Sequence, residues 1–564
     1  MSLPLLAALV IAVLGLGYAF YGRFVARQYR IDDGRTTPAT AHEDGVDFVP
    51  TGPFYLLGQH FSAIAAAGPI VGPIAACLLW GWLPCVLWIA VGVVLIGAVH
   101  DFTALVASVR HGAGSIAEIA RRQLGTRAAL LLTAFIWISL VYVIVAFTHV
   151  TAGTFLGRIE ELPGETPFHK GGGVAAAAVS YLLLAVVMGV VQKRFAPPTW
   201  VLAVVFVPLT LCCVALGTVP AVSTVVLLDE RTWFVAILAY CVVASLLPVN
   251  LLLQPRGFLG GFVLYLALAA GVIGIFFGGH AIEQPALRTP PAGDFSAMFP
   301  FLFVTIACGA CSGFHGLVCG GTTSKQIARE SHCKTVGYGA MLLEAFVALV
   351  ALATVLIVAP ADVAGRTPGQ LYGDGMASFL TVVLGRGALR FASVFGAMAF
   401  STFVFDTLDV ATRLGRYLLQ ELTGTKGFAA GLAATCLTAG VPLAILLAGA
   451  GAGYLQYWGL FGSANQLLAG LTLVACSVWL HRSGRRCWYT VLPAIFVMTI
   501  TTWSLGTHVL VGLREASAHG ASPSAINGLV ALVLLLLAVG ILLDAVRAWR
   551  RPLDPAPSSD PALA

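Results

Sequence analysis

Long apolar runs recur along the whole chain and limit its fold more than any other feature. Fifteen of them are long enough to cross about 30 Å of hydrocarbon as helices. We expect these spans at about 3–22, 54–80, 83–109, 128–156, 172–191, 199–219, 233–253, 257–278, 299–321, 336–359, 389–412, 428–451, 454–480, 488–512 and 525–546. Only 10% of the 564 residues are charged, whereas soluble domains carry about 25%. The chain is therefore predicted to be an all-α polytopic membrane protein with about 15 transmembrane helices.

Two of the expected spans, within residues 57–73 and 305–326, carry helix-breaking residues near the middle of the membrane. In the later span these residues are Gly309, Ser312, Gly313 and His315. Lipid cannot satisfy freed backbone groups, so irregular backbone at that depth survives only inside protein or along a cavity. Secondary transporters build substrate and ion sites from such discontinuous helices. The two breaks therefore predict a transporter.

The basic residues favour one orientation of the chain. Of the 31 Lys and Arg residues, 23 fall in one set of alternate loops and 8 in the other. The richer side is normally cytoplasmic, which places the N-terminus outside and the C-terminus in the cytoplasm. The two broken spans then run in opposite directions. The net charge of +6 reflects this asymmetry, and no nucleic-acid partner is expected.

Broken spans of opposite direction fit a LeuT-like inverted repeat of five plus five helices. We expect residues 1–551 to form a single transmembrane domain, and residues 552–564 a disordered cytoplasmic tail. The core repeats are placed at about 54–219 and 299–480, and the accessory helices at about 3–22, 233–278 and 488–546.

Ionisable residues within spans are costly, so each one is a candidate functional group. Asp101, Glu344 and Asp406 are the candidates for ion coupling, and the last two have no basic partner nearby in the sequence. Asp409 and Arg413 lie four residues apart, which favours a structural ion pair on one helix face.

A hydroxyl pair provides the alternative to a proton. Ser401 and Thr402 could bind sodium together with backbone carbonyls of residues 64–67, or could bond back to their own helix. The coupling ion is therefore expected to be a proton, with sodium as the alternative.

Polar and small residues near the two breaks are the candidates for binding substrate. They are Gln59, His60, Ala65, Gly68, Ser312, Gly313, His315 and Asn465. The N-termini of half-helices at such breaks favour a carboxylate. Cys308 and Cys311 form a C-x-x-C near His315, but no complete ligand set accompanies them, so neither a metal nor another cofactor is expected.

Six segments together resemble the carbon starvation protein CstA family of transporters. They are LGQHFSAIAAAGPIVGP (57–73), GAVHDF (97–102), CGACSGFHGLVCGGTTSKQI (308–327), GYGAMLLEAFVALVA (337–351), STFVFDTLDVATRL (401–414) and WGLFGSANQLLA (458–469). The segments occur in the family's order and cover about 50–480. The chain departs from the family at Gln59, where the family usually has a His, and at Cys311, which has no counterpart.

The resemblance implies a secondary transporter of the bacterial inner membrane that is induced when carbon is scarce. It also implies the amino acid–polyamine–organocation superfamily, whose core is a five-plus-five inverted repeat. Family members are associated with uptake of peptides and of pyruvate, the latter with protons. We therefore expect a symporter that imports short peptides or pyruvate by alternating access, surrounded by membrane lipid and of unknown oligomeric state. A membrane nutrient sensor or a channel is the alternative, and an enzyme is not expected.

Overall fold

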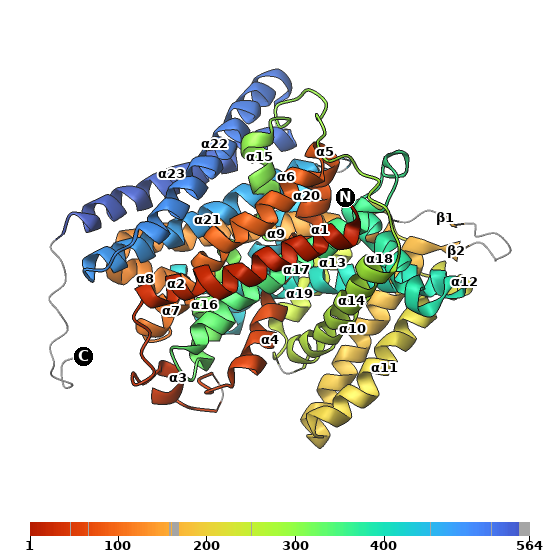
Figure 1. The fold of residues 1–564 in the computed structure, drawn as a ribbon, viewed down its shortest axis with the longest axis horizontal. Helices are drawn as coiled ribbons and strands as arrows, with labels where there is room; N and C mark the ends of the chain where they lie inside the picture. The colour runs from red at the N-terminus through yellow and green to blue at the C-terminus, as the bar shows by residue number, and fades with distance from the viewer. Residues whose placement is uncertain are drawn as a thin grey trace.

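A computed structural model describes residues 1–551 except Val46, Ala66, 157–158, 161–167, Asn250, Ala450, Ala452 and Ala521, and it describes only the backbone of Ile159 and Glu160. The expected disordered tail, 552–564, lies outside the described residues. The described chain is almost entirely helical, and its one sheet is a short antiparallel pair of β1 (Ile159–Glu160) and β2 (Phe168–His169). Figure 1 shows the helices packed side by side in one body.

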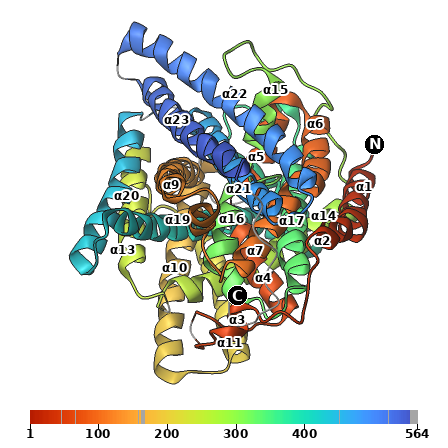
Figure 2. The same ribbon diagram turned by 90° about the vertical axis from the view of Figure 1, so that its left-hand side faces the viewer.

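The α-helices are α1 (Leu3–Leu16), α2 (Gly22–Gln28), α3 (Pro38–Ala41), α4 (Pro53–Ile64), α5 (Gly68–Trp80), α6 (Trp82–Leu87), α7 (Ala98–Arg110), α8 (Ile116–Gln123), α9 (Thr126–Phe155), α10 (Lys170–Phe195), α11 (Thr199–Gly217), α12 (Pro220–Ser223), α13 (Glu230–Leu246), α14 (Leu253–Phe277), α15 (Met298–Thr305), α16 (Gly313–Gly321), α17 (Gly339–Leu356), α18 (Pro368–Leu384), α19 (Leu389–Thr423), α20 (Phe428–Ala448), α21 (Leu455–Arg482), α22 (Trp488–His519) and α23 (Pro523–Trp549). Figure 2 shows α13 and α20 on one side of the body and α1 and α2 on the opposite side, with α16, α17 and α21 between them.

Each of the fifteen expected spans falls on a helix or on a pair of helices. By length and composition, however, only 12 helical segments of the described chain qualify as spans, or 13 if the bent pair α4–α5 counts as one. The short helix α13 has 17 residues, and α15 and α16 have 8 and 9. The structure thus confirms a polytopic helical membrane protein, while the count of fifteen stays a prediction.

The sequence did not predict α18. Its 17 residues include Asp374 and several glycines, which lower its hydropathy below that of a span. Asp374 pairs with Lys170 at the start of α10, and Arg390, in the first turn of the next helix, lies 5.0 Å from the ring of Phe168. Helix α18 and the start of α19 are thus held beside the connection between α9 and α10.

The first predicted break lies between α4 and α5, whose axes differ by 51°. The cause is local. Pro69 occupies the first turn of α5, where its missing N–H costs nothing and its fixed φ suits a helix start. The residue before a proline is pushed away from helical geometry, so a helix seldom continues through such a site. Ala65, four residues before Pro69, caps the end of α4 outside the helical region, with φ −73° and ψ 64°.

The second predicted break separates α15 from α16 over residues 306–312. Ile306 has φ −96° and ψ 52°, and Ser312 is extended, with φ −123° and ψ 127°. Gly309 and Ser312 lie within the break as expected, whereas Gly313 and His315 belong to the first turn of α16.

The two broken pairs run antiparallel and touch at their breaks. Thr51, just before α4, pairs with Ile327, which follows α16. Trp80 at the end of α5 donates its indole N–H to the carbonyl of Ser296, just before α15. At the breaks themselves, a Cβ added at Gly68 would lie 2.3 Å from the Sγ of Cys308, so only glycine allows this approach. The predicted pair of opposed, interrupted helices is therefore present.

Candidate functional site

A buried cluster of two carboxylates and two imidazoles lies at the second break. The Nδ1 atom of His315 is 2.9 Å from Oδ2 of Asp101, and its Nε2 atom is 3.1 Å from Oε2 of Glu344. The other Asp101 oxygen is 2.7 Å from Nδ1 of His100. All four side chains are at most 1% exposed. We call these four residues the histidine cluster.

Three structural elements bring the histidine cluster together. His315 lies in the first turn of α16, directly after the break, while Asp101 and His100 lie on α7 and Glu344 lies on α17. Helix α7 follows a π-helical stretch, Trp88–Gly97, of a kind often found at functional sites. A Cβ at Gly97 would lie 2.1 Å from the carbonyl oxygen of Ala310, so this glycine lets the break approach α7.

The histidine cluster can exchange protons. One imidazole serves two carboxylates, and neither Glu344 oxygen has a hydrogen bond of good geometry within the described residues. The Nε2 atom of His100 also lacks a partner there. Groups this close titrate as one unit, so a proton gained or lost by any of them changes the interactions of all. Of the ion-coupling candidates, Asp101 and Glu344 lie here together, and they share a residue that the sequence assigned to substrate binding.

Asn465 of α21 holds the backbone of the second break. Its Oδ1 atom accepts the N–H of Phe314 at 2.9 Å, and its Nδ2 atom donates to the hydroxyl of Ser312 at 3.0 Å and to Sγ of Cys308 at 3.3 Å. A Cβ at Gly313 would lie 2.4 Å from the Asn465 carbonyl oxygen. The structure thus groups Asn465, Ser312 and Gly313 as predicted, but the amide is already occupied within the protein.

The candidates on the first broken span separate into two faces of α4. His60 is buried, and its Nδ1 atom lies 2.8 Å from the hydroxyl of Thr323. Its Nε2 atom is 3.9 Å from Sγ of Cys319, which also contacts the Asp101 carbonyl. Gln59 is instead exposed and does not join the cluster.

Ala65 and Gly68 flank the first break, where the sequence placed the substrate. Ala65 is buried and ends α4, and Gly68 packs on Cys308 of the second break. These positions put the two breaks side by side, next to the histidine cluster on α16.

A second charged cluster supplies a partner that the sequence did not indicate and corrects one expectation. Asp406 does have a basic partner, because Nε of Arg256 on α14 donates to its Oδ1 atom at 2.9 Å. Arg256 also pairs with Asp409, which accepts the hydroxyl of Tyr240 at 2.8 Å. The expected pair of Asp409 with Arg413 is therefore wrong. We call Arg256, Asp406 and Asp409 the arginine cluster.

Neither Arg413 nor Arg256 has the environment that the sequence predicted. Arg413 donates to the backbone carbonyls of Ala244 and Leu247 at the end of α13. Arg256, which was counted as a loop residue, is fully buried. Its place one turn inside the apolar run of α14 was the available signal, but the acidic partners lie 150 residues or more away.

The hydroxyl pair on α19 does not face the first break. Ser401 donates to the carbonyl of Met398 one turn back, which is the bonding within the helix that was the alternative to sodium. Thr402 lies against α14, since a Cβ at Gly260 would be 3.6 Å from its methyl group. Within the described residues, no group of three or more His, Cys, Asp or Glu side chains is arranged to hold a metal ion.

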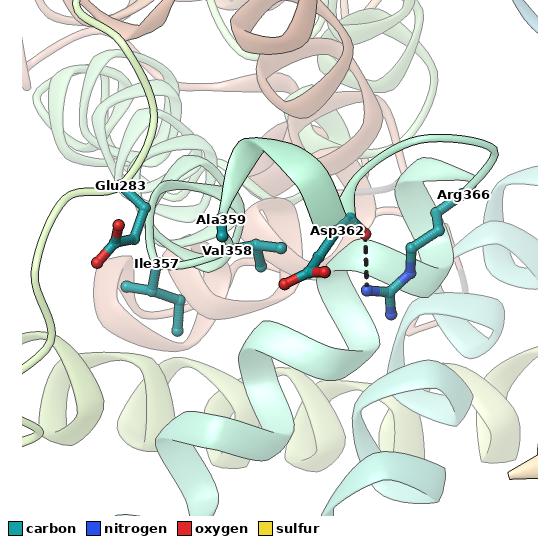
Figure 3. A pocket seen from close by; sticks show the side chains of 6 residues that line it. All are labelled: Glu283, Ile357, Val358, Ala359, Asp362 and Arg366. Atoms are coloured by element: carbon teal, nitrogen blue, oxygen red, sulfur yellow. Dashed lines mark hydrogen bonds between the residues drawn. The ribbon is translucent and has the colours of Figure 1, made fainter.

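An open cavity of about 660 Å³ lies away from all of these candidates. It is lined by Glu283, Ile357, Val358, Ala359, Asp362 and Arg366. Figure 3 shows Glu283 and Arg366 on opposite sides of it, with Arg366 donating to the Asp362 carbonyl at 3.3 Å. None of the predicted site residues lines this cavity.

Comparison with known proteins identifies relatives of the whole chain. It is 33% identical to a peptide transporter CstA of Campylobacter jejuni, with 88% of this chain and 79% of that one aligned. It is 31% identical to a peptide transporter CstA of Bacillus subtilis, with 95% of each aligned. It is also 31% identical to the pyruvate/proton symporter BtsT of Escherichia coli, over 88% of this chain and 80% of that one.

Among solved structures, a manganese transporter of Eremococcus coleocola is similar, with 13% identity, a TM-score of 0.42 and coverage of 89% of this chain and 97% of that one. The sequence model of the carbon starvation protein CstA matches residues 2–374 and 362–504. The named relatives are transporters rather than enzymes. This membrane protein therefore belongs to the carbon starvation protein CstA family.

Proposed function

We propose that this protein is a proton-coupled symporter that imports a small carboxylate-bearing nutrient, pyruvate or a short peptide, across the bacterial inner membrane when carbon is scarce. The observation that carries the proposal is the placement of His315 between Asp101 and Glu344, directly after a helix break. A proton on this cluster changes its charge at the point where the transmembrane helix is interrupted. Proton binding is thereby coupled to the conformation of the break.

The breaks also supply a site for a carboxylate. Helices α5 and α16 begin at the breaks, and a helix start carries free N–H groups and a positive dipole end. Asn465 already accepts the Phe314 N–H on α16. At the start of α5, Pro69 has no N–H, and the N–H groups of Ile70 and Val71 donate to the Ala67 carbonyl. Both starts therefore attract a substrate carboxylate mainly through the positive ends of their helix dipoles. Two relatives, a peptide transporter and a pyruvate/proton symporter, agree with this substrate chemistry.

The overall mechanism is alternating access in a five-plus-five inverted repeat. Its support is the antiparallel course of the two broken pairs, from Thr51 beside Ile327 to Trp80 beside Ser296. The distribution of basic residues favours a cytoplasmic position for α4 and α16, with the N-terminus in the periplasm and the C-terminus in the cytoplasm.

Purified protein in proteoliposomes tests this function. We expect labelled pyruvate or a labelled dipeptide to accumulate when an inward proton gradient is imposed, and not when the gradient is collapsed with an ionophore. A sodium gradient alone should give no accumulation. Equal uptake with and without gradients would contradict coupling and indicate a channel, whereas binding without flux would indicate a sensor.

A ligand screen by thermal stabilisation identifies the substrate. A compound that binds the native state raises its apparent stability by about 2.7 kcal/mol at 100 times its Kd. Pyruvate, other small monocarboxylates, amino acids and dipeptides form the panel. Amidated analogues without a carboxylate are the matched controls and should give no shift.

A further inference from the structure

The segment between α2 and α4 crosses the polypeptide that follows α16. We call residues 29–51 the N-terminal strap. Its end runs beside the segment after α16, with the Val49 N–H 3.2 Å from the Lys325 carbonyl and the Thr51 N–H 3.0 Å from the Gln326 carbonyl. The strap therefore joins the start of one broken helix to the end of the other through backbone hydrogen bonds.

Glu330 anchors the same strap. This carboxylate is 1% exposed and accepts both Nε and a terminal nitrogen of Arg110 at 2.9 Å, a nitrogen of Arg35 at 3.0 Å, and the Asp32 N–H at 3.0 Å. Burial raises the pKa of Glu330, but the hydrogen bonds and positive charges of Arg110 and Arg35 outweigh it and lower the pKa below its usual value. Glu330 thus stays charged and keeps the strap tied to the end of α7.

A second carboxylate repeats the attachment. Asp33 of the strap accepts the N–H and the hydroxyl of Ser331, both at 2.8 Å. Directly between the helices, His60 of α4 bonds to Thr323 after α16. Four sets of polar contacts therefore connect the strap and α4 to the segment after α16. They lie at Glu330, at Asp33, at residues 49–51 and at His60.

The face of α4 that lies against α14 makes fewer polar contacts. Helix α4 lies against α14 through Gly58, close to the Tyr265 hydroxyl, and through Ser62, whose hydroxyl would be 3.8 Å from a Cβ at Gly261. Within the part of the chain that the structure describes, no hydrogen bond or ion pair joins α4 to α14. The contact between α4 and α14 can therefore form and separate without breaking a hydrogen bond or an ion pair.

We propose that the N-terminal strap locks α4, α16 and the adjoining end of α7 into one rigid body that moves as a unit against α14. The proposal rests on the proposed function, because the motion is the cytoplasmic half of alternating access. The strap and Glu330 are then a permanent brace within the moving body, and not a gate that opens in each cycle. The gate is the contact between α4 and α14.

Two engineered disulfides separate the brace from the gate. Thr51→Cys with Ile327→Cys links residues that are bridge partners, which places their Cα atoms within disulfide range. Ser62→Cys with Gly261→Cys links α4 to α14 across the proposed gate. Both are made in a Cys212→Ala, Cys436→Ala background, because these two native cysteines are exposed. Uptake is compared before oxidation, after oxidation and after reduction.

Opposite outcomes are expected from the two pairs. Oxidised Thr51→Cys/Ile327→Cys should transport within about twofold of its reduced form, whereas oxidised Ser62→Cys/Gly261→Cys should fall at least about tenfold and recover on reduction, as expected when a required gating motion is blocked. Reversible loss of uptake in the first pair would overturn the proposal, because the strap would then have to separate. Unchanged uptake in the second pair would overturn it equally.

Absence of uptake in the unmodified protein would contradict the proposed function. In that case, distance measurements still test whether α4, α16 and the end of α7 move as one rigid body. Spin labels at the exposed positions Gln59 and Thr322 report the distance between α4 and the end of α16, and labels at Gln59 and Leu266 report that between α4 and α14. We expect one distance for the first pair and two for the second. Two distances for the first pair, or one for the second, would overturn the proposal.

Discussion

The histidine cluster and the arginine cluster are alike in composition, since each places one nitrogen-bearing side chain between two carboxylates. Asp406 of the arginine cluster is partly exposed, whereas both carboxylates of the histidine cluster are buried. They differ in the central group and in the helices that hold it. His315 lies beside a helix break, and an imidazole can release its proton and become neutral. Arg256 lies on continuous helices, and guanidinium keeps its charge at every physiological pH.

This difference in the central group indicates separate roles for the two clusters. A proton that enters the histidine cluster changes its net charge and can be released again. In the arginine cluster, Tyr240 bonds to both Asp409 and Arg256, and Tyr181 donates to the Arg256 carbonyl at 2.8 Å. Oδ1 of Asp409 has no hydrogen bond within the described residues, and Asp406 is partly exposed. We therefore propose that Asp101 and Glu344 couple the ion together with His315, and that Asp406 has a supporting role.

Replacing Arg256 by Met should have the largest effect on folding. Asp409, which is buried, and Asp406, which is partly exposed, would lose their counter-charge. Removal of one partner from a buried ion pair costs about 3–5 kcal/mol. Thermal unfolding in detergent measures the loss. The control Arg256→Met/Asp406→Asn/Asp409→Asn removes all three charges and should recover most of the stability. If Arg256→Met were as stable as the parent protein, the arginine cluster would not have the structural role that distinguishes it from the histidine cluster.

Replacing His315 by Gln should have the largest effect on transport. The amide still fits between Asp101 and Glu344 but cannot carry a proton, so proton-driven uptake should fall at least about tenfold, a barrier increase of about 1.4 kcal/mol. The loss of stability should be smaller than for Arg256→Met, because protons can neutralise the two carboxylates. Normal uptake with an unchanged dependence on the proton gradient would remove the histidine cluster from the coupling mechanism.

Glu344→Gln should uncouple transport with less loss of rate. The substitution preserves the size of the side chain and removes one charge from the cluster, so we expect substrate exchange to continue while accumulation against a gradient is lost. The measurement compares counterflow with proton-driven uptake in the same proteoliposomes. Asp406→Asn is the matched control in the arginine cluster and should retain accumulation. If Asp406→Asn lost accumulation and Glu344→Gln retained it, the arginine cluster would couple the ion instead of the histidine cluster.

Asn465→Ala should loosen the second break without changing either cluster. The Phe314 N–H and the Ser312 hydroxyl would lose a buried partner, at a cost of about 1–3 kcal/mol. Asn465→Asp keeps the acceptor for Phe314 and should lose less stability. Equal stability of all three proteins would show that the amide does not hold the break.

Ser401→Ala should have the smallest effect. Its hydroxyl is bonded to Met398 of its own helix, so the loss of stability should be within about 1 kcal/mol. Uptake should be unchanged at any sodium concentration. A sodium-dependent uptake that this substitution abolishes would restore the alternative coupling ion.

The sequence predicted the broken helices because their causes are local. Pro69 and the residues around Gly309 interrupt apolar runs, and the structure breaks both helices there. The missed helix α18 shows the limit of the same reasoning. A segment of 17 residues with a charged side chain does not resemble a span, and only its contacts with Lys170 and its neighbours hold it in the fold.

Partnerships between polar residues could be predicted only in part. Asp101, Glu344 and His315 each stood out as ionisable groups in apolar runs, but nothing in the sequence joined residues 214 apart. The error at Asp409 has the same origin, since Arg413 was the nearest basic residue along the helix while Arg256 was the nearest in space.

Hydropathy and helix-breaking residues by themselves determined that this chain is a helical membrane protein with two interrupted spans. Hydropathy and helix breaking both depend on residues within a few turns of one helix, so they can be identified from the sequence alone. Which carboxylate meets an imidazole and which meets a guanidinium was decided only by the packing of α7, α14, α16, α17 and α19. The physical reason is that a buried charge needs a partner in space, and several partners far apart in the chain are equally compatible with the sequence pattern.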